Sequence, residues 1–206
     1  MQLTASAFVV FTVLFSYPAT HSALADSLTN SQEDDLRMAS RDGRIESVRA
    51  LLKRGISVDS PTSSGRTALM FAAQSGQSKI VALLLDAGAN PDLTDDRDHT
   101  PLMLASKNCF TKAVEVLLAK RPDLNRRNSV GRTALILSSE NACAKVVELL
   151  AAAPGIDFRV EDDWGKNAFE YASENQISGY DNRSIFYLKP LMMRLANGQP
   201  VQTLRP

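Results

Sequence analysis

Residues 65–76 read Gly-Arg-Thr-Ala-Leu-Met-Phe-Ala-Ala-Gln-Ser-Gly, and the central part of this pattern returns along the chain at a fixed interval. Thr67, Thr100 and Thr133 lie 33 residues apart, and each is followed by Ala or Pro and then by Leu. Further positions repeat in the same register, in four series: Leu36, Leu69, Leu102 and Leu135; Ala39, Ala72, Ala105 and Ser138; Val48, Val81, Val114 and Val147; Leu51, Leu84, Leu117 and Leu150. A period of this length indicates a solenoid, because a single unit is too small to bury its own apolar face.

Each repeat carries the signals of two short helices. The repeated Thr can cap the first helix through its hydroxyl, and Pro101 follows one such Thr, where a missing N–H costs little. Gly43 and Gly76 fall between the helices, where a left-handed turn favours glycine. Spacings such as Ile80 and Leu84 place apolar side chains on one helical face. The sequence therefore predicts stacked helix–turn–helix units.

These motifs resemble the ankyrin repeat family, whose unit is a β-turn with two antiparallel helices, the motif T-P-L-H-x-A and a period of 33 residues. The resemblance covers residues 32–175 and implies an all-α repeat fold, an ankyrin-type solenoid of helix–turn–helix units joined by β-hairpin fingers. The histidine of the motif is replaced by Met70, Met103 and Ile136, so apolar packing is expected to replace its hydrogen bonds. The whole chain is also similar to short exported ankyrin proteins of Gram-negative bacteria.

We expect about five units within an ankyrin domain of residues 26–197, and the outer two serve as caps: 32–62, 63–95, 96–128, 129–162 and 163–197. A mobile tail at 198–206 follows. The first unit has Asp34 in place of Thr, so we expect a helical lid that begins with a cap at Ser31 and carries no finger. Arg121 stands where the other second helices are followed by glycine, so that helix end is expected to be less regular.

The N-terminus is typical of an export signal. Residues 5–15 form an apolar run that is too short to span a bilayer. Ala23-Leu24-Ala25 fits a cleavage site, which makes 1–25 a signal peptide and places the cut between Ala25 and Asp26. No basic side chain precedes Arg37, so the amino group of Met1 must supply the positive charge alone, or translation starts elsewhere. The alternative is a buried N-terminal strand or helix. An exported chain works in an oxidising compartment, with the periplasm as first choice and the extracellular space as second.

Composition argues against several functions. The chain has 23 Lys+Arg and 23 Asp+Glu, so it lacks the basic field of a general nucleic-acid or anionic-membrane binder. It contains no G-x-S-x-G, P-loop, H-E-x-x-H or C-x-x-C motif, and His99 is the only histidine after the predicted cleavage. Carboxylate pairs such as Asp162-Asp163 are adjacent in sequence and expected to be solvated. We therefore predict no catalytic residue, no metal and no cofactor, with an enzyme whose site these motifs miss as the alternative.

The two cysteines occupy nearly the same place in consecutive units. Corresponding atoms of stacked helices lie roughly 8–10 Å apart, beyond the Cα separation of about 7 Å that a disulfide tolerates. The offset of one residue between Cys109 and Cys143 can bring them closer. The sequence allows two alternatives, a disulfide or two half-buried free thiols. Export to an oxidising compartment favours the disulfide.

The resemblance implies that fingers and inner helices bind protein partners. The finger at 92–99 is acidic, the one at 125–132 is basic, and the one at 159–164 is acidic again. Such alternation suits selection of a partner by complementary charge, or it lets neighbouring fingers pair with each other. An indole at a finger tip exposes apolar area unless it folds back against Tyr171 or Phe186. The predicted contact surface consists of Arg66, Arg97, His99, Arg126, Arg127, Arg132 and Trp164.

The sequence thus predicts an exported, non-catalytic protein–protein interaction module, a periplasmic accessory or scaffold protein. Its partners are one or more proteins; neither nucleic acid nor stable membrane insertion is expected. A secreted effector that binds host proteins is the second reading, and an enzyme with an unrecognised site is the third.

Overall fold

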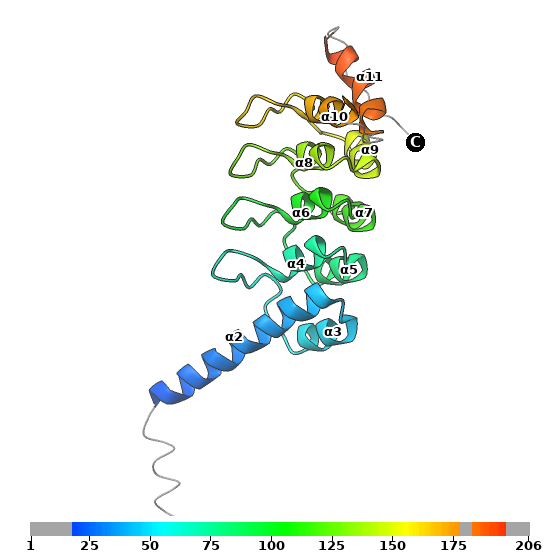
Figure 1. The fold of residues 1–206 in the computed structure, drawn as a ribbon. Coiled ribbons are helices and arrows are strands. Elements are labelled where there is room, and N and C mark those ends of the chain that lie inside the picture. Colours follow the sequence, from blue (N-terminus) through cyan, green and yellow to red (C-terminus); the bar gives the residue numbers. More distant parts are fainter. Residues whose placement is uncertain (1–17, 178–182, 197–206) are drawn as a thin grey trace, which may run out of the picture.

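The computed structural model describes the backbone of residues 18–177 and 183–196, and the side chains of residues 30–175 and 183–193. Within these ranges the chain forms ten helices that pair along the sequence and stack into an elongated solenoid (Figure 1). Their bounds are α2 Pro18–Asp42, α3 Ile45–Lys53, α4 Ala68–Gln74, α5 Ser78–Asp86, α6 Pro101–Lys107, α7 Thr111–Leu118, α8 Ala134–Glu140, α9 Ala144–Ala152, α10 Ala168–Ile177 and α11 Ser184–Ala196.

The helices form two layers. The inner layer consists of α4, α6, α8 and α10, each in contact with the next, and the outer layer contains α5, α7 and α9 (Figure 1). Helix α2 packs against α3 and α4 at one end of the stack, and α11 packs against α9 and α10 at the other. Four loops project from the inner layer as fingers, so the inner helices and the fingers together form one surface, which we call the finger face.

The repeated threonines begin the inner helices as predicted. The hydroxyl oxygens of Thr67, Thr100 and Thr133 accept hydrogen bonds from the backbone N–H three residues later, at 3.2–3.4 Å. Each satisfies one of the backbone donors that a helix leaves free in its first turn.

The periodic apolar residues form the core. Every member of the Leu36 and Val48 series is at most 1% exposed. Burying one such side chain contributes about 1.5–3 kcal/mol. Because each inner helix contacts the next one along the stack, the core is continuous from α2 to α11.

The turns between the helices adopt the predicted left-handed conformation, with φ of 79° at Gly43 and 69° at Gly76. Cys109 and Ala142 take the same conformation in the next two units, with φ of 59° and 55°. At the end of α7, Arg121 has φ of 53° and so forms the left-handed turn that glycine forms elsewhere. The irregularity expected at Arg121 is therefore small, and α7 is only one residue shorter than α5 and α9.

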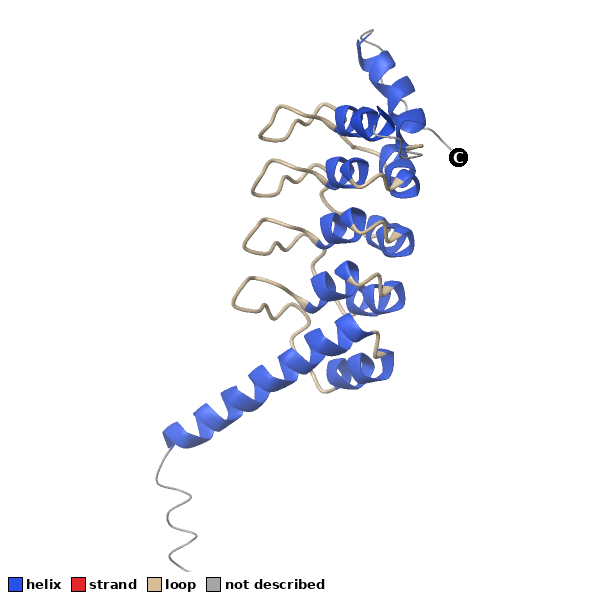
Figure 2. Ribbon diagram, in the orientation of Figure 1, coloured by secondary structure: helices blue, strands red, loops and turns tan. Residues whose placement is uncertain are grey.

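The fingers are hairpin-shaped loops, and no strand occurs in the described part of the chain (Figure 2). In the second finger, the backbone N–H of Asp95 donates to the carbonyl of His99 at 3.2 Å. The Asp95 side chain accepts from the N–H groups of Arg97 and His99, both at 2.9 Å. Because the Asp95 side chain takes these donors, the predicted hairpin finger forms here as a closed turn without a strand ladder.

The same turn recurs in each finger. The closing hydrogen bonds define four tips, at residues 62–66, 95–99, 128–132 and 162–166. Neighbouring tips are joined by backbone hydrogen bonds, for example from Ser129 N–H to the Arg97 carbonyl at 3.0 Å. The fingers therefore stack in register with the helices below them.

The N-terminal helix differs from the prediction. Helix α2 begins at Pro18 and runs without a break to Asp42, so Ser31 lies inside it and does not cap it. The physical reason is that the segment between Pro18 and Gly43 contains neither proline nor glycine after its first residue, so nothing interrupts the helix. The predicted cleavage point between Ala25 and Asp26 falls within α2. Most of the predicted signal peptide (residues 1–17) and the tail at 198–206 lie outside the described residues.

None of the helices described is long and apolar enough to cross a bilayer.

Candidate functional site

A column of basic residues runs along the finger face, where each finger returns to its inner helix. The column contains Arg66, His99, Arg132 and Lys166. Each of them is followed eight residues later by a side chain in the last turn of the inner helix: Gln74, Lys107, Glu140 and Glu174. The fold aligns these pairs because tips and helices repeat in the same register, so the pairs can be compared unit by unit.

In the last two units the pairs are ionic. Arg132 Nη1 lies 2.8 Å and 2.9 Å from the two carboxylate oxygens of Glu140. Lys166 Nζ lies 2.7 Å from Glu174. We call this part of the finger face, with α8, α10 and the tips at 128–132 and 162–166, the closed half.

Arg132 is the centre of a larger network in the closed half. Its Nε donates to Asp162 at 3.1 Å and its Nη2 donates to the Tyr171 hydroxyl at 2.8 Å. The Tyr171 hydroxyl donates in turn to Asp162 at 2.6 Å. The guanidinium carbon also lies 4.9 Å from the ring centroid of Trp164. This arrangement covers Arg132, whose side chain is only 18% exposed.

Asp162 is buried, with 4% of its surface exposed, so the prediction that it is solvated is wrong. Its Oδ1 accepts the backbone N–H groups of Trp164 and Lys166, as the equivalent Asp95 does in its own finger. Burial alone raises the pKa of Asp162, but the hydrogen bonds from Tyr171, Lys166 N–H and Arg132 outweigh it and lower the pKa. Asp162 therefore stays ionised and neutralises Arg132.

The first two fingers are arranged differently. The Arg66 Nη2 donates to the neutral amide oxygen of Gln74, and its guanidinium carbon lies 4.3 Å from the Phe71 ring centroid. His99 has Lys107 in the position that Glu140 takes in the closed half, and its Nδ1 lies 3.3 Å from the Asp95 carboxylate instead. We call α4, α6 and the tips at 62–66 and 95–99 the open half.

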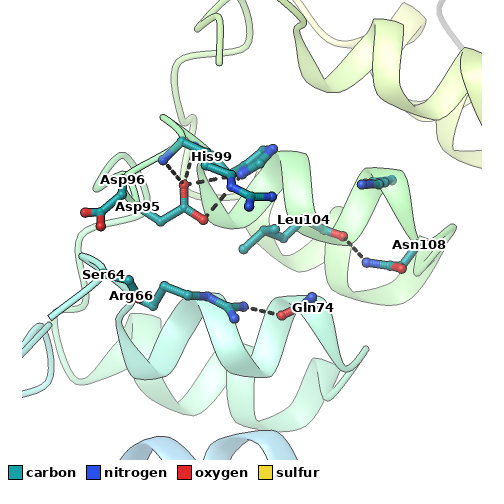
Figure 3. A pocket seen from close by; sticks show the side chains of 10 residues that line it. Ser64, Arg66, Gln74, Asp95, Asp96, His99, Leu104 and Asn108 are labelled. Carbon is teal, nitrogen blue, oxygen red and sulfur yellow. Dashed lines mark hydrogen bonds and ion pairs between the residues drawn. The ribbon is translucent and has the colours of Figure 1, made fainter. Parts of the chain in front are cut away.

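A pocket of about 480 Å³ lies in the open half between these two fingers and their helices (Figure 3). Arg66 and Gln74 lie on one side of it, and His99 and Asp95 on the other (Figure 3). Arg97, Lys107 and the nearly buried Leu104 also line it. Apart from Leu104 the pocket is lined by polar residues, and it faces solvent on the finger face.

The structure separates the predicted contact residues into groups. Arg66, Arg97 and His99 line the pocket. Arg132 and Trp164 belong to the closed half, and Trp164 is 62% exposed beside Arg132. Arg127 donates to the Gly131 carbonyl at 3.1 Å and to Asp163 of the next finger at 3.3 Å. Arg126 is exposed.

Sequence reasoning missed Lys107, Glu140 and Tyr171. For Lys107 and Glu140 the signal was the spacing of eight residues between the end of a finger and the end of its inner helix. Tyr171 lies 39 residues from Arg132 and was considered only as a contact of Trp164.

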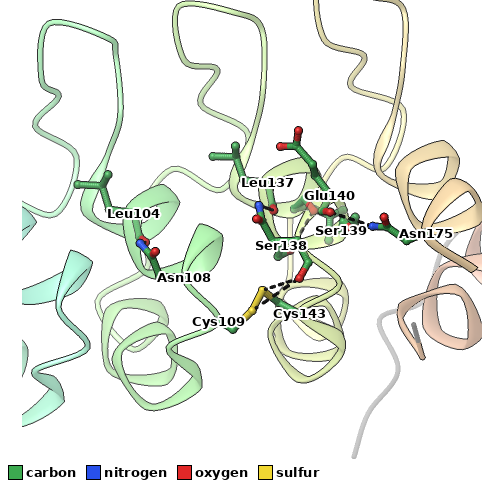
Figure 4. The surroundings of a disulfide bond; sticks show 11 residues. Leu104, Asn108, Cys109, Leu137, Ser138, Ser139, Glu140, Cys143 and Asn175 are labelled. Atoms are coloured by element: carbon green, nitrogen blue, oxygen red, sulfur yellow. Dashed lines mark hydrogen bonds between the residues drawn. A yellow bond between two sulfur atoms is a disulfide. The ribbon is translucent and has the colours of Figure 1, made fainter. Parts of the chain in front are cut away.

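Cys109 and Cys143 form a disulfide with a Cα–Cα distance of 5.1 Å (Figure 4). Cys109 occupies the left-handed turn of its unit, and Cys143 precedes the second helix of the next unit. The same two positions meet one unit earlier, where a Cβ added to Gly76 would lie 2.5 Å from the Phe110 ring. Gly76 and Phe110 are 34 residues apart, as Cys109 and Cys143 are. The offset of one residue from the 33-residue period is therefore the spacing at which neighbouring turns touch.

No group of three or more His, Cys, Asp or Glu side chains that could hold a metal ion occurs among the residues whose side chains are described.

The fold and the finger face define a repeat protein of the kind that presents a continuous surface to a partner. The family model for ankyrin repeats (three copies) matches residues 20–95 and 87–162, and the chain therefore belongs to the ankyrin repeat family. A comparison with curated proteins gives no match. Ankyrin repeats imply a protein–protein interaction module, and such domains are typically non-catalytic.

Proposed function

We propose that this protein is an exported binding module that works in the periplasm as an accessory or scaffold protein. It contacts its partner through the finger face, with Arg66, Arg97, His99, Arg126, Arg127, Arg132 and Trp164 as the contact residues. The observation that carries the proposal is the pocket of about 480 Å³ in the open half, where cationic side chains face solvent on the finger face of a chain of the ankyrin repeat family.

Two features support export. Ala23-Leu24-Ala25 follows an apolar run and fits a signal cleavage site. The Cys109–Cys143 disulfide joins two neighbouring units, and disulfides persist in oxidising compartments. In this account the mature protein begins at Asp26, the units keep the predicted boundaries, and α2 loses its first residues on processing.

Site-specific photocrosslinking in the cells that make the protein tests the binding surface. A photoreactive residue replaces Ser64 or Trp164, both exposed on finger tips, or Lys112, which is exposed on outer helix α7. The proposal predicts one discrete protein adduct from the finger positions and none from Lys112. Equal labelling at all three positions, or no adduct at any of them, would overturn it.

Cell fractionation with intact mass analysis under non-reducing conditions tests export. The expected species lies in the periplasmic fraction, begins at Asp26 and weighs two hydrogens less than the reduced chain. A cytoplasmic species that retains Met1 would contradict export, and the same species in the culture medium would favour the secreted effector.

A further inference from the structure

The open half lacks the carboxylates that neutralise the basic column in the closed half. At the end of the inner helix, Glu140 and Glu174 face Arg132 and Lys166. The equivalent positions next to Arg66 and His99 hold Gln74 and Lys107. The helix position that supplies an anion in one half therefore supplies a neutral amide or a second cation in the other.

The cations of the open half are incompletely paired. Among the residues whose side chains are described, neither Lys107 nor Arg97 forms a side-chain ion pair. Arg66 has only Gln74 as a side-chain hydrogen-bond partner, and its Nε is buried without an acceptor. Three cations thus line one pocket with no carboxylate bound to any of them.

The acidic side chains that line the same pocket do not neutralise these three cations. Asp95 already accepts two backbone N–H groups and lies against His99. Asp96 is exposed at the finger tip, where it makes no ion pair within the described residues. The lining holds three cations and two carboxylates, so an added carboxylate meets a net positive site.

The closed half shows which group fits such a site. There a glutamate carboxylate lies between the finger and the inner helix and accepts two hydrogen bonds from a guanidinium. Resting on the proposed function, we propose that the pocket of the open half binds glutamate or aspartate side chains from an acidic segment of the partner protein. Arg66, Arg97 and Lys107 bind the carboxylates, and Leu104 contacts the aliphatic part of the bound side chain.

Titration with a defined peptide tests this assignment. The probe is a short peptide of alternating Glu and Gly, acetylated and amidated so that only side-chain carboxylates are present. We expect it to bind the full-length oxidised protein, with affinity that falls as ionic strength rises from about 0.05 to 0.5 M. The same peptide with Gln in place of Glu should not bind.

Matched variants locate the site. Lys107→Glu restores the acidic residue found in the closed half, and it should weaken peptide binding by about tenfold or more. Lys107→Arg should retain binding. The control is Lys79→Glu, which makes the same change of charge at an exposed position of outer helix α5 and should alter affinity less than about twofold. Since Lys107 is exposed, the thermal midpoint should stay unchanged in all three variants.

Three outcomes would overturn the inference: no binding of the Glu peptide, equal weakening by Lys79→Glu and Lys107→Glu, or equally tight binding of a single-stranded oligothymidine. The last would indicate non-selective attraction of polyanions. If finger-tip crosslinks form but the peptide does not bind, the proposed function stands and the acidic-segment assignment fails. If both fail, neither stands.

Discussion

The open and closed halves of the finger face share one backbone and differ in a few side chains. Both have finger turns organised by a Thr, Asp or Asn side chain, a basic residue where the finger ends, and a facing residue on the inner helix. In the closed half Asp162, Glu140 and Tyr171 surround Arg132. In the open half Lys107 replaces the glutamate and a pocket remains. The residue that faces the finger base therefore decides whether the basic column has a carboxylate partner on the inner helix of its own unit.

The largest effect is expected from breaking the closed half. Asp162→Ala should lower the free energy of unfolding by about 3 kcal/mol, because it removes the buried one of the two carboxylates that pair with Arg132 and the acceptor of the finger turn. Chemical denaturation measures this change. Asp95→Ala in the open half is the matched control and should cost about 1–2 kcal/mol, since Asp95 faces no arginine. Equal losses in the two variants would show that the halves do not differ energetically.

A loss of stability nearly as large is expected from reducing the disulfide that links the two halves. The Cys109–Cys143 disulfide joins the unit of α6 and α7 to the unit of α8 and α9, across a sequence separation of 34 residues. Reduction should lower the free energy of unfolding by about 3 kcal/mol, mainly because the unfolded chain gains freedom. Denaturation with and without reductant measures it. A variant with both cysteines changed to Ser should respond identically in the two conditions; any remaining response to reductant would have a different origin.

A smaller effect is expected from pH. Since the folded protein holds the pKa of Asp162 below its ordinary value, the carboxylate stabilises the fold above about pH 4. That contribution should be lost as the pH falls through the ordinary value and then through the lower folded value. Asp162→Asn should flatten this part of the profile, because Asn128 shows that an amide can organise the same turn. An unchanged acid profile in Asp162→Asn would assign the acid sensitivity to other groups.

The smallest effect is expected at the exposed indole. Trp164→Ala should cost about 0.5–1 kcal/mol of stability, since the ring covers Arg132 from the solvent side and most of its surface is exposed. Thermal unfolding measures this change. A loss above about 2 kcal/mol would mean that Trp164 belongs to the core of the closed half.

The fold could be predicted from the sequence because the 33-residue period repeats features whose physics is local. Thr67 caps its helix because its hydroxyl reaches the first turn, and Leu69 is buried because neighbouring units stack on it. The network at Arg132 could not be predicted in the same way. Its members lie 8, 30 and 39 residues away, and their approach depends on the relative register of finger and helix.

Asp162 is the instructive case. Together with Asp163 it has the sequence pattern of a solvated acidic pair. Its position in the repeat, however, corresponds to that of Asp95 and Asn128, whose side chains organise the finger turns. Comparing units position by position would have shown this. The same comparison shows that Cys109 and Cys143 occupy the positions where Gly76 and Phe110 meet one unit earlier. It also identifies Gln74 and Lys107 as the residues that replace the glutamate of the closed half.

We propose that the partner contacts the open half of the finger face more closely than the closed half. Photocrosslinking at Ser64 and at Val130 tests it most directly, because these residues occupy the same place in their fingers, one in each half. The account predicts a discrete protein adduct in higher yield from Ser64 than from Val130. Equal yields at the two positions, or a higher yield at Val130, would contradict it.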